Sequence, residues 1–142
     1  MRKPAAGRAG RHRCLRVGSY RSITIVQTML DARQTSALHH PDLSEIDLPS
    51  LLHALSDPMR LEIVRCLACS DAGNLPCNAI ELPVSKATAS HHFKVLRQAG
   101  VIEQHDEGTR RISRIRHDDL EARFPGLLES VLRAAQTDQA RD

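Results

Sequence analysis

The sequence of 142 residues predicts one mostly α-helical domain that carries a small β-hairpin. Apolar residues recur with helical spacing in three stretches before Gly100, whereas two short and partly alternating runs follow Gly100. The chain contains one Tyr, two Phe and no Trp, so the core is expected to be aliphatic. A chain of this length has room for a single modest core, which predicts one folded domain.

The stretch from Ser85 to Gly100 predicts the helix around which the domain is organised. Ser85 is a favourable N-cap, and a narrow apolar stripe follows at helical spacing through Ala89, Phe93 and Leu96. The opposite side of this helix bears small, polar or basic side chains: Lys86, Ala87, Thr88, Ser90, His91, Lys94 and Gln98. Such side chains are suited to base edges and phosphates, so we expect this face to contact DNA.

A short helix is expected just before this stretch. Asn78 is placed to cap it together with Glu81, and Pro83 ends it because the residue before a proline avoids the α conformation. A short helix, a tight break and a helix with a polar face are typical of a helix-turn-helix.

Two further helices are predicted upstream. The first enters through Asp47 and Pro49 and carries an apolar stripe of Leu48, Leu51, Leu52 and Leu55. The second begins with Asp57 as cap and Pro58 at its first position, and places Leu61, Val64, Leu67 and Ala68 on one side. The segment 71–74 predicts a turn.

The segments 101–106 and 110–116 predict the strands of a hairpin whose turn is Glu107-Gly108-Thr109. The return strand is strongly basic, with Arg110, Arg111, Arg114 and Arg116. A basic hairpin alone is usually only a solvated surface. Behind a helix-turn-helix, however, it is typical of a wing that lies along the phosphate backbone or in the minor groove, and here we expect Arg110, Arg111 and Arg114 to contact DNA. The fold class predicted is therefore a winged helix-turn-helix.

The end of the chain predicts another helical segment capped by Asp118, an interruption at 124–126 and a last helix. Its apolar stripe and the stripe of the first helix exceed what one small core needs, so we expect a two-fold dimer in which the first and last helices pack together. The alternative is that both stripes simply close the core of one chain. The residues assigned to dimerisation are Leu48, Leu51, Leu52, Leu55, Leu128, Val131, Leu132 and Ala135.

Charge divides the chain unevenly. Residues 1–30 hold seven of the 20 Lys and Arg and no acid, which leaves 13 basic against 17 acidic residues in 31–142. The folded part is therefore mildly acidic, and any affinity for nucleic acid must come from a local basic face. We expect residues 1–41 to be a disordered basic extension and linker, 42–136 the folded domain and 137–142 a disordered tail. Translation starting at Met29 is an equally open explanation of the composition break.

Three blocks resemble the ArsR (arsenic-repressor-like) family of bacterial transcriptional regulators. They are LSDPMRLEIVRCL at 55–67, VSKATASHHFKVLRQAGVI at 84–102 and EGTRR at 107–111, and the similarity covers about 48–136. The resemblance implies a dimeric winged-helix repressor that leaves its operator when an inducer binds. By motif position it also implies base contacts from Lys86, Thr88, Ser90 and His91, and a wing tip at Arg110 and Arg111.

The sensing half departs from the family pattern. Metal-sensing members typically carry Cys-x-Cys at the start of the short helix, or an Asp-x-His pair completed on the last helix, and neither set is present here. Three cysteines remain as candidate sensor thiols, on the assumption that they converge: Cys66, Cys69 and Cys77. The alternative is that these thiols only pack, since buried free Cys commonly behaves as a small hydrophobe. His92 is expected to be a polar or capping residue near the hairpin.

We therefore predict a cytoplasmic, sequence-specific DNA-binding regulator, a dimeric repressor that is released from its operator by an effector: a metal ion, a thiol oxidant or a small molecule. The alternative is a winged-helix module for protein–protein assembly or RNA binding. The sequence shows no nucleophile–base grouping, phosphate loop or paired catalytic carboxylates, so no enzymatic activity, cofactor or metal is predicted. It also has no apolar run of membrane-spanning length.

Overall fold

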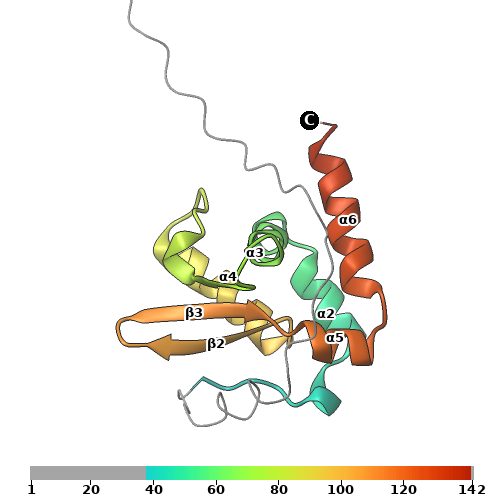
Figure 1. Ribbon diagram of the computed structural model, residues 1–142, viewed down its shortest axis with the longest axis horizontal. Coiled ribbons are helices and arrows are strands. Elements are labelled where there is room, and N and C mark those ends of the chain that lie inside the picture. The colour runs from blue at the N-terminus through green and yellow to red at the C-terminus, as the bar shows by residue number, and fades with distance from the viewer. Residues whose placement is uncertain (1–37, 142) are drawn as a thin grey trace, which may run out of the picture.

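The computed structural model describes residues 38–141, and Figure 1 shows helices gathered around one end of a long hairpin. The fold class predicted from the sequence, mostly α with a small hairpin wing, is confirmed. The elements in chain order are η1 (Leu43–Glu45), α2 (Leu48–Leu55), α3 (Pro58–Ala68), β1 (Asn74–Pro76), η2 (Cys77–Ala79), α4 (Lys86–Gln98), β2 (Ile102–Glu107), β3 (Arg110–Ile115), α5 (His117–Arg123) and α6 (Leu127–Gln139).

The predicted caps of α2 and α3 are confirmed. The Asp47 carboxylate accepts a hydrogen bond from the Ser50 N–H at 3.0 Å, and the Asp57 carboxylate accepts from the N–H groups of Met59 and Arg60 at 2.8 and 3.1 Å. Both helices have a proline in the first turn, where a missing N–H costs nothing. Their start points therefore follow directly from the sequence.

The short helix before α4 differs from the prediction. The segment Asn74–Pro76 is a strand that pairs with β3, and only one 3₁₀ turn, Cys77–Ala79, follows it. Asn78 lies inside that turn, and no side chain caps it. The predicted cap at Asn78 is wrong because pairing with β3 keeps the chain extended through Pro76, which leaves too few residues for an α-helix before Pro83.

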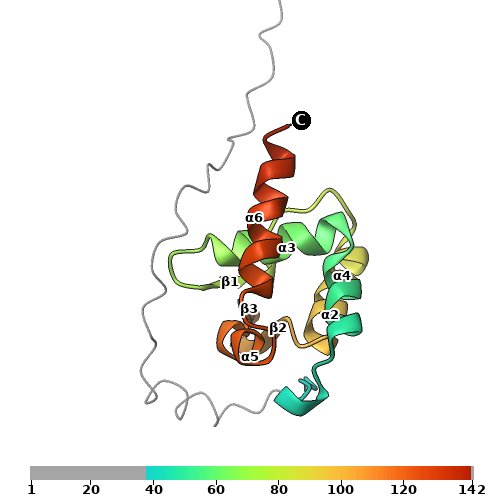
Figure 2. The same ribbon diagram turned by 90° about the vertical axis from the view of Figure 1, so that its right-hand side faces the viewer.

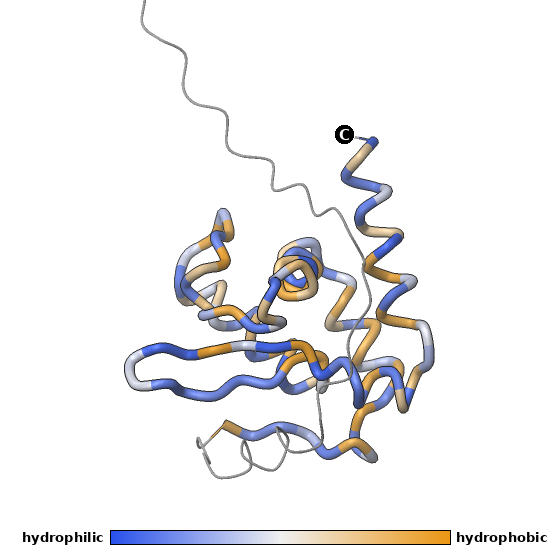
Figure 3. Tube along the Cα trace, in the orientation of Figure 1, coloured by the Kyte–Doolittle hydropathy of each residue, from blue (hydrophilic) through white to orange (hydrophobic). Residues whose placement is uncertain are grey.

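The sheet has the strand order β1-β3-β2, and both pairings are antiparallel. Ile102 lies opposite Ile115 at the base of the hairpin and Glu107 opposite Arg110 at its tip. Gly108 has a φ of +60° in the connecting turn, as the predicted hairpin requires. Figure 1 shows the tip projecting away from α5 and α6, and Figure 3 shows that the outer part of the hairpin is mostly hydrophilic.

One mostly aliphatic core joins the helices to the base of the sheet; Phe93 is buried in it, and the half-buried Phe124 packs against it. Its fully buried side chains include Ile46, Ile63, Val64, Leu67, Leu96, Val101, Ile102 and Leu120. Gly100 ends α4 with a φ of +79°, and the N–H of the next residue, Val101, bonds to the Leu96 carbonyl at 3.0 Å. This left-handed turn leads the chain from α4 directly into β2.

The apolar stripes assigned to dimerisation are mostly used within one chain. The prediction that they exceed one core is wrong for Leu51, Leu55, Leu128, Leu132 and Ala135, which are all buried. The reason is that α6 packs its stripe against the same cluster that holds α2 and α3. Leu48 and Leu52 remain 41% and 45% exposed, and Val131 is half-buried. Figure 2 shows the C-terminal half of α6 extending beyond the other helices.

The predicted linker is wrong at its last two residues. The His40 ring nitrogen Nε2 accepts a hydrogen bond from the backbone N–H of Gln104 at 2.9 Å, and the carbonyl of buried Pro41 accepts one from Arg116 at 2.6 Å. Burial lowers the pKa of His40, and the nearby charges of Arg97 and Arg116 lower it further, which favours the neutral ring that this acceptor role needs.

The C-terminal boundaries also differ from the predictions. Helix α5 begins at His117 with Arg116 at the N-cap position, so Asp118 lies in the first turn and is not the cap. Helix α6 runs to Gln139 and includes part of the predicted tail. The predicted basic extension, the start at Met29 and most of the predicted linker lie outside the described residues. Within 38–141, no helix is long and apolar enough to cross a bilayer.

Candidate nucleic-acid interface

The start of α4 is fixed by the predicted cap. The Ser85 hydroxyl accepts a hydrogen bond from the Thr88 N–H at 3.2 Å and lies 2.9 Å from the Thr88 hydroxyl. No acidic side chain lies in the first turn, and Lys86 is its first residue. The remaining free N–H groups and the helix dipole therefore present positive potential to solvent, which suits a phosphate.

The predicted division of α4 into two faces is confirmed. Phe93 and Leu96 are buried in the core, and Ala89 is half-buried. All residues of the predicted contact face are exposed: Lys86, Ala87, Thr88, Ser90, His91, Lys94 and Gln98. A helix that is anchored by one face and exposes a row of small, polar and basic side chains on the other has the form of a major-groove reading helix.

His92 does not lie near the hairpin, and that expectation is wrong. Its ring is buried, and its Nδ1 lies 3.9 Å from the Asp57 carboxylate at the start of α3. Position 92 is adjacent to the core stripe on the helix surface, so it turns toward α3 rather than toward β2. Within the described residues Nδ1 has no hydrogen-bond partner.

The wing arginines are partly neutralised by the opposite strand. The Arg111 Nε donates to the Asp106 carboxylate at 2.8 Å, and Arg114 forms an ion pair with Glu103. Hydrogen bonding from Arg111 lowers the pKa of Asp106, so this acid remains charged beside its partner. Arg111 keeps 44% of its side chain exposed, and Arg110 at the tip is exposed without an ion-pair partner within residues 38–141. The positive charge that is free for phosphates is therefore concentrated at the tip.

The structure shows a residue that the sequence did not single out. Arg60 on α3 is buried, and its guanidinium donates to the carbonyls of Ala54 and His53 at 2.6 and 2.9 Å. The bond to Ala54 satisfies a free C-terminal carbonyl of α2, and the bond to His53 adds to those that the Ser56 hydroxyl and N–H already donate to the same carbonyl. The only sequence signal was a charged residue one turn after the Asp57 cap. Arg60 thus fixes α2 against the start of α3, on which His92 of α4 also packs.

Comparison with known proteins agrees with this geometry. A family model described as a helix-turn-helix domain matches residues 55–105, which include α3, α4 and most of β2. The chain is 34% identical over 88 residues to YceK of Bacillus subtilis, an HTH-type transcriptional regulator; the match covers 57% of this chain and 82% of that protein. It is 31% identical over 80 residues to the arsenical resistance operon repressor of Staphylococcus xylosus, covering 56% of this chain and 75% of the relative.

The chain belongs to the ArsR family of helix-turn-helix transcriptional regulators. A solved structure of another ArsR family regulator aligns with a TM-score of 0.46 and 18% identity, over 66% of this chain and 86% of that one. As a member of this family, the protein is a DNA-binding transcriptional regulator. The exposed face of α4 and the hairpin tip are its candidate interface with DNA.

This ArsR regulator does not bring the three predicted thiols together as metal ligands. Within residues 38–141, no three His, Cys, Asp or Glu side chains form a group that could hold a metal ion. Cys66 lies on α3, where its thiol is 3.5 Å from Glu62; burial, and then the Glu62 charge, raise its pKa. The Cys77 thiol lies 3.1 Å from the Ser113 hydroxyl of the sheet, and Cys69 is disulfide-bonded and therefore has no free thiol. The predicted convergence is therefore wrong.

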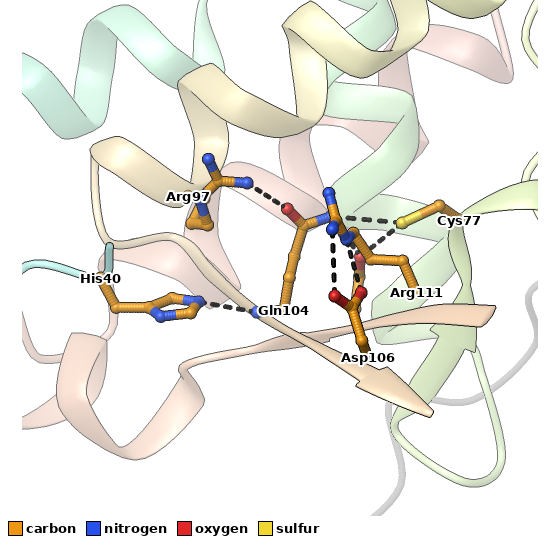
Figure 4. A network of polar contacts seen from close by, with 7 residues as sticks. His40, Cys77, Arg97, Gln104, Asp106 and Arg111 are labelled. Carbon is orange, nitrogen blue, oxygen red and sulfur yellow. Dashed lines mark hydrogen bonds and ion pairs between the residues drawn. The ribbon is translucent and has the colours of Figure 1, made fainter. Parts of the chain in front are cut away.

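Cys77 belongs to a polar network that joins η2, β2, β3 and α4 (Figure 4). The side-chain amide of buried Gln104 donates to the Cys77 thiol at 3.2 Å and to the Ser113 hydroxyl at 3.0 Å. Its oxygen accepts a hydrogen bond from Arg97 of α4 at 2.7 Å. A polar side chain at a buried strand position must be satisfied, and this one links α4 of the ArsR regulator to its hairpin.

Proposed function

We propose that the protein is a dimeric repressor that binds its operator with the exposed face of α4 in the major groove and the β2–β3 tip on the phosphate backbone. The observation that carries this proposal is the exposed row on α4 beside a projecting hairpin whose tip bears Arg110 and Arg111. Both surfaces are held by buried contacts, so no large rearrangement is needed before DNA binds.

We assign different parts of the DNA to α4 and to the hairpin. The residues assigned to bases and nearby phosphates are Lys86, Ala87, Thr88, Ser90, His91 and Lys94, and those assigned to the backbone are Arg110, Arg111 and Arg114. Of the three arginines, Arg114 is expected to contribute least to DNA affinity, because it is half-buried and paired with Glu103. Repression then follows from occlusion, because a small dimer on a promoter excludes polymerase.

Dimerisation is proposed to use the part of the predicted stripes that one chain leaves open. Leu48 and Leu52 are four positions apart and therefore lie on one side of α2, where both are more than two-fifths exposed. An exposed pair of this kind marks an interface when it is continuous with other apolar surface. A two-fold dimer would present two copies of α4 to half-sites about one DNA turn apart.

An effector is proposed to act by shifting the dimer to a state in which the two α4 helices no longer match the half-sites. The thiols of Cys66 and Cys77 remain candidates for such sensing as separate sites, since each is free.

The function is tested by fluorescence anisotropy with the DNA upstream of the protein's own gene and a scrambled duplex of equal length, across a salt series. Specific regulators bind about 10³-fold or more tightly to their site than to other DNA, and affinity falls steeply with salt. We expect preferential, salt-sensitive binding to the native duplex. Equal and weak binding to both duplexes would refute operator binding at this site and favour a role in assembly.

A further inference from the structure

A cleft of about 460 Å³ lies between the reading helix and the wing. Ser90, Phe93 and Arg97 of α4 line one side, and Gln104, Asp106 and Arg111 of the hairpin line the other. Its volume is within the range of small-molecule sites, about 300–1,000 Å³. It is bordered by both surfaces that the proposed function assigns to DNA.

Arg97 supplies a cation to this cleft that no acid neutralises. Its Nη1 donates to the neutral Gln104 amide oxygen, and it has no carboxylate partner in the part of the chain that the structure describes. Its Nε is buried and has no hydrogen-bond partner among the same residues. A buried guanidinium donor without an acceptor is costly, because its hydration is lost without replacement.

Arg111, the other arginine of the cleft, does have a carboxylate partner. Arg111 is neutralised by Asp106 through two hydrogen bonds of 2.8 and 3.2 Å. The charged side chains of the lining are Arg97, Asp106 and Arg111. Because Asp106 and Arg111 balance each other, the charge of Arg97 remains unbalanced. Burial lowers the pKa of Arg97, and the nearby Arg111 charge lowers it further. A bound anion would oppose both effects.

The Gln104 amide has little capacity left for recognition. The Gln104 amide already donates to Cys77 and Ser113 and accepts from Arg97. Phe93 contributes apolar lining beside them. The arrangement thus offers the Arg97 guanidinium as the one unbalanced cation for an anionic group, with Phe93 next to it.

We propose that this cleft binds a small organic carboxylate, whose anionic group pairs with Arg97 and whose compact apolar body lies against Phe93. The inference rests on the proposed function for its regulatory consequence. Ser90 and Arg111 line the cleft and are also proposed DNA contacts, so an occupant lies where the reading helix and the wing must meet the duplex. The carboxylate therefore acts as an inducer that competes with operator DNA.

The test uses the full chain and two probes of the same shape, benzoate and the neutral benzamide. Binding is measured without DNA, by two-dimensional NMR titration and by the rate at which iodoacetamide alkylates Cys77. The free thiol of Cys66, which does not line the cleft, is the internal reference. We expect benzoate to shift the signals of cleft residues and to slow alkylation at Cys77 only. Benzamide is expected to do neither at concentrations up to about 20 mM, above the millimolar range expected for a fragment.

Variants assign the effect to Arg97. R97Q is expected to weaken benzoate about tenfold through loss of a charge-assisted pair, R97K to retain a measurable part of the affinity, and R133Q on the exposed surface of α6 to bind as the wild type does. Equal binding of benzoate by R97Q and R133Q, or equal effects of benzoate and benzamide, would overturn the proposal. R97K keeps the test valid if R97Q unfolds.

A final arm adds operator DNA. Displacement of the duplex by benzoate supports the inducer role, and benzoate binding without any DNA binding supports the site while refuting the proposed function. If benzoate produces no shift and R97Q weakens DNA, the cleft receives a DNA phosphate instead, and the proposal is overturned.

Discussion

Replacing Gly100 by alanine tests how tightly the end of α4 is packed against the segment before α2. Gly100 has a φ of +79°, and an added Cβ would lie 2.6 and 2.7 Å from Cγ1 and Cδ1 of Ile46. Ile46 is 1% exposed, so it has no open space to move into. The left-handed conformation costs an alanine about 1–2 kcal/mol, and an extra methyl in a packed core costs about 1–3 kcal/mol more.

Gly73 provides a matched control for the backbone cost. It has a φ of +69°, and an added Cβ would meet nothing within 4 Å. G73A therefore carries the conformational cost alone, and any effect of alanine on the unfolded chain is similar in both variants. Urea denaturation at one protein concentration should show G100A less stable than G73A by about 1–3 kcal/mol. Equal losses in the two variants would refute the close packing of Ile46 on Gly100.

Three further changes test other contacts. Burial alone would raise the pKa of Asp57, but hydrogen bonds from the Arg60 and Met59 N–H groups and the charges of Arg60 and His92 outweigh it, so the pKa is lowered. The stability that Asp57 contributes is therefore complete above its pKa in the unfolded chain and is lost as pH falls through its pKa in the folded protein, so D57N should flatten the pH dependence of unfolding below about pH 4. An unchanged slope would argue against the cap. R60A should reduce the free energy of unfolding by about 1–3 kcal/mol in urea, since it leaves the Ala54 carbonyl without its donor, whereas the His53 carbonyl keeps the hydrogen bonds from Ser56. A loss below about 0.5 kcal/mol would contradict that role. L52E should yield a folded monomer in sedimentation velocity, and an unchanged dimer would remove Leu52 from the interface.

Local signals in the sequence predicted the helix caps, the exposed face of α4 and the hairpin turn, because these features depend on residues close together in the chain. Asp47, Asp57 and Ser85 are caps in the structure because their side chains meet N–H groups two or three residues ahead. The exposed row on α4 follows from helical spacing alone. The hairpin turn at Gly108 follows from the need for a positive φ between two strands.

Features that depend on distant partners were not predictable in this way. Strand β1 has three residues, one of them a proline, and exists because β3 lies beside it almost forty positions later. Whether Leu128 and Leu132 face a partner or their own chain depends on how α6 turns after Gly126, which spacing does not reveal. Gln104 gave no signal, since its role arises from Arg97, Cys77 and Ser113 meeting around it.

The most direct test of the account compares H91A and R111A on the native and scrambled duplexes by fluorescence anisotropy across a salt series, with R133A as the control. If α4 contacts bases and the wing contacts phosphates, H91A should reduce the preference for the native duplex by about 1–3 kcal/mol. R111A should weaken both duplexes alike and lower the salt slope by about one. If both H91A and R111A bind the two duplexes as tightly as R133A does, the assignment of α4 and the hairpin to DNA is contradicted.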